Sequence, residues 1–271
     1  MRALEDHGVS RVRACVIVGQ PRRTLYCHRK PKDDDPIATR LQELAQQRPR
    51  FGWRRLLVLF RRKDPIGEYR FRRIYRDLAL QVRPRKKRKV RYIRGNAIPA
   101  VVAPNARWSV DFMHDRLASG RSVRTMNIVD DFTRECLALD IAFSFGSADV
   151  IRCFEDLSFE RGFPKTIRFD NGSEFTSRAM LQWGAERDVQ LHFIEPGRPM
   201  QNAHIESLNG KIRDELLNAH SFLTIFEARR KAAEWLGDYN EVRPHSALGY
   251  LTPREFADRF QTTPPSQFSA A

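Results

Sequence analysis

The chain has 271 residues, enough for two domains, and its hydrophobic fraction of 41% excludes disorder throughout. No apolar run reaches the roughly 18 residues of a membrane helix, and the first residues lack the apolar core of a secretion signal, so we expect a cytoplasmic protein without a membrane partner. The formal net charge is +15; residues 1–100 carry 28 Lys and Arg against 9 Asp and Glu, whereas the remainder carries 20 against 24. A basic amino-terminal part of this strength indicates a partner rich in phosphate, since each neutralised phosphate releases counterions.

The basic part predicts helices. Apolar residues at helical spacing within residues 9–17, breakers at 19–21 and a second short stretch at 24–26 are consistent with a helix-turn-helix, although a plain helical hairpin has the same pattern. After the acidic helix start at 33–36, apolar residues recur at helical spacing to Leu78, with arginines on the opposite faces. The arginines that we expect to face a polyanion are Arg54, Arg55, Arg72 and Arg73.

Residues 83–104 predict a linker that is basic first and then rich in Gly and Pro. Its alternative interpretation is a solvated segment without a partner. The basic residues that we expect to contact nucleic acid there are Arg85, Lys86, Lys87, Arg88 and Lys89. The expected division of the chain is a helix-turn-helix-like region (1–82), the linker (83–104), a catalytic core (105–220), a helical extension (221–260) and a disordered tail (261–271).

Beyond the linker, short alternating runs at 108–112, 124–129 and 135–142 predict three strands of an antiparallel meander. The order that follows is helix, strand, helix, strand and two long helices, at 147–161, 166–169, 177–187, 189–194, 201–219 and 225–240. This order predicts a mixed sheet flanked by helices. The four cysteines form no Cys-x-x-Cys pair and are expected to be reduced, buried thiols.

Three carboxylates stand out in this acidic part of the chain. Asp111 lies inside the first strand, where a charge is costly to bury; Asp170 ends a strand and enters an Asn-Gly turn; Glu206 lies on a helix. Three such carboxylates at one edge of the sheet could hold a pair of Mg²⁺ ions. Spacing alone leaves open both ordinary capping roles and three competing acids, Asp130, Asp131 and Asp140.

Longer motifs around these acids resemble a known family. The stretches Trp108-Ser-Val-Asp-Phe112, Asp170-Asn-Gly-Ser-Glu-Phe175 and residues 196–210 are similar to the signature of the DDE transposases of bacterial insertion sequences, a group in the retroviral-integrase-like superfamily. The 35 residues between Asp170 and Glu206 are a spacing typical of this group. Residues 213–218 and 239–253 resemble the downstream-frame (OrfB-type) catalytic polypeptide of the IS-three family.

The resemblance implies an α/β, ribonuclease-H-like core with a mixed five-stranded sheet and two Mg²⁺ or Mn²⁺ ions on Asp111, Asp170 and Glu206. It implies cleavage of double-stranded DNA at the element's ends with water as nucleophile, followed by transfer of the exposed 3′-hydroxyl to target DNA. It also implies a homo-multimer in synapsis, a nucleoid-associated location and, where the full transposase is a frameshift fusion, an upstream-frame partner protein.

On the helix of Glu206, polar and basic residues are expected to hold the DNA backbone: Asn202, Lys211 and Arg213. For the last two the alternative is a solvated face on which they offset neighbouring acids. Two other functions remain open from the sequence. One is a non-catalytic DNA-binding regulator or inactive transposase relic, and the other is a ribonuclease H acting on RNA–DNA hybrids.

Overall fold

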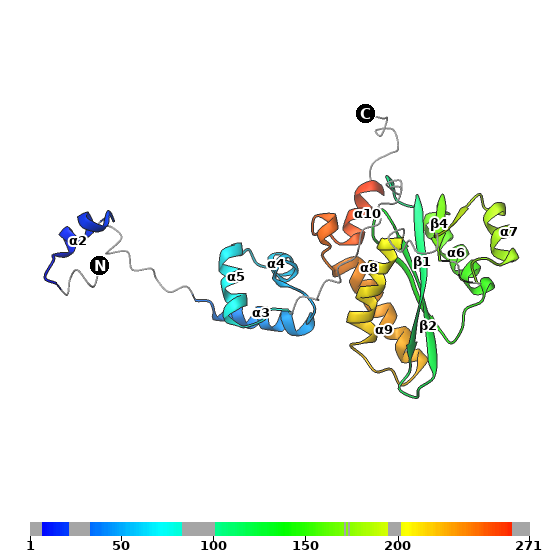
Figure 1. The fold of residues 1–271 in the computed structure, drawn as a ribbon, viewed down its shortest axis with the longest axis horizontal. Helices are drawn as coiled ribbons and strands as arrows, with labels where there is room; N and C mark the ends of the chain where they lie inside the picture. Colours follow the sequence, from blue (N-terminus) through cyan, green and yellow to red (C-terminus); the bar gives the residue numbers. More distant parts are fainter. Residues whose placement is uncertain are drawn as a thin grey trace, which may run out of the picture.

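The computed structural model describes residues 7–21, 33–82, 101–170, 172, 174–194 and 202–261. In the basic part, four helices lie within these ranges: α2 (Arg11–Val18), α3 (Asp35–Gln47), α4 (Trp53–Arg61) and α5 (Glu68–Asp77) (Figure 1). The predicted helix near residues 24–26 and the basic run 85–89 lie outside the described residues. Along the described part of the chain, no helix is both long and apolar enough to cross a membrane.

Helices α3, α4 and α5 form a small unit with its own core, here called the helical unit. Phe60 and Phe71 meet edge to face with ring centroids 5.5 Å apart. The other fully buried apolar side chains of this core are Leu41, Phe51, Leu56, Leu57, Ile74 and Tyr75. The helical spacing predicted from these residues is confirmed. By contrast, α2 buries Ala14 and Cys15 but exposes Val16 and Ile17, so only part of its apolar stripe is covered.

The sheet has five strands in the order β3-β2-β1-β4-β5. They are β1 (Arg107–Arg116), β2 (Ser122–Asp130), β3 (Cys136–Ala142), β4 (Thr166–Phe169) and β5 (Gln190–Phe193). The pairs β1–β2 and β2–β3 are antiparallel, whereas β4 pairs parallel with both β1 and β5. The predicted meander and mixed sheet are both confirmed.

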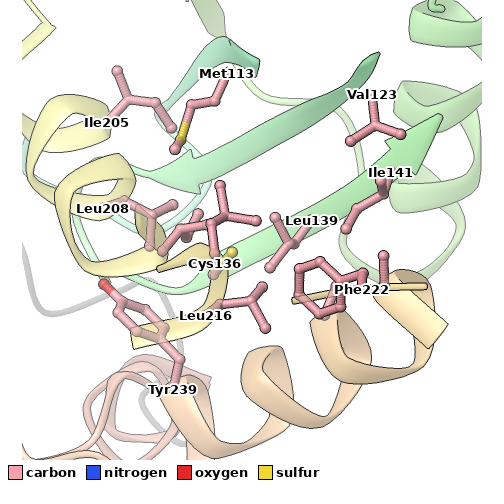
Figure 2. Packing of buried hydrophobic residues seen from close by; sticks show 14 of the residues in the cluster. Met113, Val123, Cys136, Leu139, Ile141, Ile205, Leu208, Leu216, Phe222 and Tyr239 are labelled. Atoms are coloured by element: carbon pink, nitrogen blue, oxygen red, sulfur yellow. The ribbon is translucent and has the colours of Figure 1, made fainter. Parts of the chain in front are cut away.

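Strand alternation gives the sheet two apolar faces. Trp108 and Val110 of β1 point to the face covered by α6 (Ser147–Arg161) and α7 (Arg178–Glu186), where they pack with Phe154. On the opposite face Met113 packs under α8 (Ala203–Ile212), and α9 (Ile225–Gly237) continues this layer. Figure 2 shows Ile205 and Leu208 of α8 turned toward the strands, with Leu216, Phe222 and Tyr239 below them. Odd-numbered positions of β1 therefore lie beneath α8.

The two long helices predicted at 201–219 and 225–240 are confirmed, although each ends in a π-helix that the sequence analysis did not predict. Helix α8 passes into a π-helix at Arg213–Leu217, and α9 into another at Asp238–Val242. The adjacent residues Leu216 and Leu217 of the first π-helix are both buried in the core beneath the sheet. The sequence analysis also missed α10 (Pro253–Gln261) and the short 3₁₀ turn Ser246–Leu248.

The described cysteines, Cys15, Cys136 and Cys153, are free and buried, which confirms the expectation of reduced thiols for these three.

Candidate catalytic site

Asp111 lies in the centre of the sheet and is held by two asparagines. It occupies an odd position of β1, opposite Asn127 of β2, and so faces α8. Asn209 of α8 donates from Nδ2 to Oδ2 of Asp111 at 2.6 Å and accepts at Oδ1 from Nδ2 of Asn127 at 2.7 Å. Because Asn127 is fully buried, this chain of hydrogen bonds fixes both the carboxylate and the position of α8 over the strands.

Asp170 is brought next to Asp111 by the sheet topology, since it follows β4 and β4 pairs with β1. Its Oδ1 accepts a hydrogen bond from the backbone N–H of Gly172 at 3.0 Å, which closes a local turn. A Cβ at Gly172 would stand 3.1 Å from Oδ1 of Asp170 and 3.1 Å from Oε2 of Glu174, so only glycine leaves both carboxylates undisturbed. The Asp170 side chain itself is exposed.

Aromatic rings support this turn from the α6 side of the sheet. Phe175 stacks on Phe169 at 4.6 Å and on Phe112 at 5.1 Å between ring centroids. The guanidinium of Arg124 lies 4.2 Å from the centroid of the Phe112 ring and donates to Glu174. The turn carrying Asp170 is therefore anchored on both of its sides.

Glu206 completes the set from the first turn of α8, where a carboxylate is favoured by the helix dipole. Its side chain is exposed, and partial burial raises its pKa.

The three carboxylates share one electrostatic environment. The pKa of Asp111 is raised from 3.8 to about 6, mainly by burial and then by the negative charge of Asp170, with a smaller contribution from Glu206. The hydrogen bonds from Phe112 N–H and Asn209 oppose this shift. Among the described residues, no group of three or more His, Cys, Asp and Glu side chains is yet close enough together to hold a metal ion. The carboxylates thus repel one another across a site that is open between them.

The competing acids have structural partners instead. Asp130 is buried and accepts hydrogen bonds from the backbone N–H groups of Asn105, Phe132 and Thr133. Asp131 accepts from Arg107 Nε at 2.6 Å and from Ser109 Oγ at 2.8 Å.

Asp140 lies on β3, the edge strand, with β2 between it and β1. It lines a separate cleft between α6 and α9.

The expected DNA contacts of α8 lie in different environments. Asn202 is buried, and its Oδ1 has no hydrogen-bonding partner in the described structure. Arg213 donates to the carbonyl oxygen of His114 at 3.1 Å. Lys211 lies with its Nζ 5.8 Å from the centroid of the Tyr239 ring.

The four arginines of the helical unit that we expect to contact DNA also lie in different environments. Arg54 and Arg72 are exposed and lie on Trp53, at 4.8 and 5.2 Å from its ring to the guanidinium carbon. Arg73 pairs with Asp34, and Arg55 is half-buried beside Phe51.

The sequence analysis missed Asn127 and the positioning role of Asn209. A polar residue opposite Asp111 in the predicted hairpin, and another one turn beyond Glu206, were the available signals.

Comparison with known proteins places this geometry in a family. The family described as "Integrase core domain" matches residues 101–199, and a second family of the same description matches residues 187–253. A Burkholderia multivorans protein, "Insertion element IS407 uncharacterized 31.7 kDa protein", is 44% identical over 261 residues, covering 96% of this chain and 94% of its own. The Escherichia coli "Transposase InsD for insertion element IS2A/D/F/H/I/K" is 25% identical, covering 92% of this chain and 90% of its own.

The chain belongs to the DDE transposases of bacterial insertion sequences. It is thus a polynucleotidyl transferase that binds DNA, and its relationship to the OrfB-type proteins of the IS-three family is consistent with these matches. The solved structure of a simian T-cell lymphotropic virus intasome, in complex with PP2A regulatory subunit B56 gamma, shows the same fold. Its TM-score is 0.55 at 16% identity, over 85% of this transposase and 77% of the viral chain.

Proposed function

We propose that Asp111, Asp170 and Glu206 hold two divalent metal ions, Mg²⁺ or Mn²⁺, and that this site cuts the ends of the element and joins them to target DNA. The observation that carries the proposal is the placement of Asp111, a half-buried carboxylate of the central strand β1, next to the strand β4 that ends at Asp170 and under the helix α8 that carries Glu206. Burial, and then the negative charges of these two acids, raise the pKa of Asp111. Oxygen donors of this kind are the ligands that hard cations prefer. A cation would neutralise the mutual repulsion that the site now contains.

The three acids differ in exposure and in their hydrogen bonds, and this suggests how the site assembles. Asp111 is fixed by Asn209, whereas Asp170 and Glu206 are exposed at a turn and at a helix start. Rotation of the two exposed side chains toward the fixed one would gather the donor set. When bound, a pair of ions would activate the attacking oxygen and stabilise the departing one.

The residues of the chain then have separate roles. In cleavage, a water oxygen forms a bond to phosphorus and the 3′-oxygen departs; in strand transfer, that 3′-hydroxyl attacks a target phosphodiester in the same manner. Asn209 and Asn127 are positioning residues that keep the Asp111 carboxylate aimed at α8. Gly172 is a positioning residue for Asp170. We further propose that the active form is a multimer that pairs two DNA ends, and that an upstream-frame partner and nucleoid association belong to this system.

The test is cleavage and strand transfer on an element-end duplex with Mg²⁺. Asp170→Asn and Glu206→Gln are expected to lose at least a hundredfold in rate while they keep DNA binding, because each removes a metal ligand. Asp140→Asn is the matched control, an acid on the same sheet that lies outside the site, and is expected to keep wild-type activity. Wild-type rates in both triad variants would refute the assignment. Turnover of an RNA–DNA hybrid in preference to duplex DNA would indicate a ribonuclease H instead.

A further inference from the structure

A cluster of charged residues lies where the helical unit meets the carboxy-terminal segments. Here called the junction cluster, it consists of Arg55 of α4, Lys211 of α8, Glu215 of the first π-helix and Arg243, which follows the second. Arg243 donates to both oxygens of Glu215, one of them at 2.7 Å, although its own side chain is only 3% exposed.

Two aromatic rings hold the cations of this cluster together. The guanidinium carbons of Arg55 and Arg243 lie 5.5 and 5.0 Å from the centroid of the Phe51 ring. Lys211 Nζ and the Arg243 guanidinium carbon lie 5.8 and 6.0 Å from the centroid of the Tyr239 ring. Phe51 belongs to the helical unit and Tyr239 to the second π-helix, so the cluster spans both parts of the chain.

The junction cluster has more positive charge and more donors than it has acceptors. Glu215 is the carboxylate that acts on Lys211 and Arg55, and it already accepts from Arg243. Within the described structure, Nε of Arg243 is buried without a hydrogen-bonding partner, and the guanidinium of Arg55 lies over the ring of Phe51. Lys211 donates to the carbonyl and hydroxyl oxygens of Ser207 at 3.2 and 3.0 Å, which leaves one of its three N–H groups.

Burial and mutual repulsion of these cations lower the pKa values of basic side chains in and next to the junction cluster. The pKa of Lys211 is lowered to about 8 by burial and then by Arg243 and Arg55. The pKa of His245, next to the cluster, is lowered to about 3 by burial and the same cations, so this imidazole stays neutral and adds no charge. An anion would relieve the repulsion and supply the missing acceptors.

We propose that the junction cluster binds one backbone phosphate of the DNA, held by Arg55 and Lys211, both only half-buried, with Arg243 behind them. We assign this phosphate to DNA because the chain is a transposase. In addition, the neighbouring exposed face of the helical unit carries Arg54 and Arg72, which lie on the ring of Trp53. The site would hold the DNA between the helical unit and α8, the helix that carries Glu206. The proposal rests on DNA as the ligand of the chain but not on the metal-binding roles of the acids.

The experiment measures affinity for an element-end duplex against salt concentration, without divalent ions, so that its outcome is independent of the catalytic carboxylates. Arg55→Gln and Lys211→Gln are each expected to lower the affinity about tenfold at low salt and to reduce the slope of log K against log[salt] by about 0.9, the value for one phosphate contact. Lys211→Arg keeps the charge and is expected to keep the slope. Arg230→Gln, an exposed cation of α9 paired with Glu234, is the matched control and should leave the slope unchanged.

The variant Glu215→Gln distinguishes two roles of the junction cluster. The cluster is either a site that binds an anion or a set of ion pairs that only joins the helical unit to the carboxy-terminal segments. Under the proposal, removal of the one opposing carboxylate strengthens DNA binding about threefold or more. Weaker binding of Glu215→Gln, or a wild-type slope in both Arg55→Gln and Lys211→Gln, would overturn the proposal. A second experiment adds inorganic phosphate without DNA and measures thermal stability. If low concentrations of phosphate stabilise the wild type in a saturable manner, and the variants keep the wild-type slope of log K against log[salt] for DNA, the site binds free phosphate and the assignment to DNA is refuted.

Discussion

Replacement of Asp111 by asparagine should stabilise the metal-free protein while it abolishes catalysis. Burial and like charges raise the pKa of Asp111 from 3.8 to about 6, so ionisation of this group opposes folding. A shift of about 2 pH units corresponds to roughly 3 kcal/mol at pH 7 as an upper limit, and we expect about 1–3 kcal/mol. For a protein of this size that raises Tm by about 2–10 °C.

The pH dependence of this effect has a definite sign. Below about pH 4 the acid is protonated in the folded and the unfolded states, and the variant gains nothing. Between about 4 and 6 only the unfolded state ionises, so wild-type stability falls by about 1.4 kcal/mol per pH unit from this group. Above the folded pKa the penalty is constant, and the advantage of Asp111→Asn is complete.

The assay is thermal and urea unfolding in a chelator at pH 4 and at pH 7. Asp115→Asn, on the same strand and the same face, is the control and is expected to change stability by less than about 0.5 kcal/mol. Added Mg²⁺ should stabilise the wild type and not Asp111→Asn. A variant no more stable than the wild type at pH 7, or equally stabilised at both pH values, would refute the reasoning.

Two further substitutions test the surroundings of the site. Gly172→Ala places a Cβ 3.1 Å from the carboxylate oxygens of Asp170 and Glu174, and we expect at least a tenfold loss of cleavage rate with Tm within about 2 °C of wild type; wild-type cleavage would show that the turn has room. Asp131→Ala removes the buried carboxylate that pairs with Arg107, and urea unfolding should show a loss of roughly 3–5 kcal/mol. A loss below about 1 kcal/mol would mean that the pair is dispensable.

The strands could be predicted because a half-buried strand shows its alternation directly. Trp108 and Val110 pack under α6 while Asp111 and Met113 face α8, and that alternation is visible in the letters of β1. Proximity of Asp111 and Asp170 follows from the same pattern once β4 is placed beside β1.

The helix endings could not be predicted in this way. In the π-helix Arg213–Leu217, Leu216 and Leu217 pack against residues distant in sequence, and hydrophobic spacing alone does not distinguish a π-helix from an α-helix. Arg243 is a second example, because the fold buries it between Glu215 and Phe51, which are distant from it in sequence.

The roles of the asparagines depend on register as well as on pattern. Asn127 lies opposite Asp111 only because the turn between β1 and β2 sets that pairing, and Asn209 reaches Asp111 only because α8 packs across the strands. In the sequence alone, nothing distinguishes Asn127 and Asn209 from other polar residues, because their contacts form only when β2 and α8 pack against β1.

The most direct test of the central claim is a crystal structure of the transposase bound to element-end DNA and Mn²⁺, with anomalous diffraction recorded for manganese. We expect manganese peaks bounded by Asp111, Asp170 and Glu206, and their loss in Glu206→Gln. A well-ordered DNA complex with no manganese between these carboxylates would contradict the account.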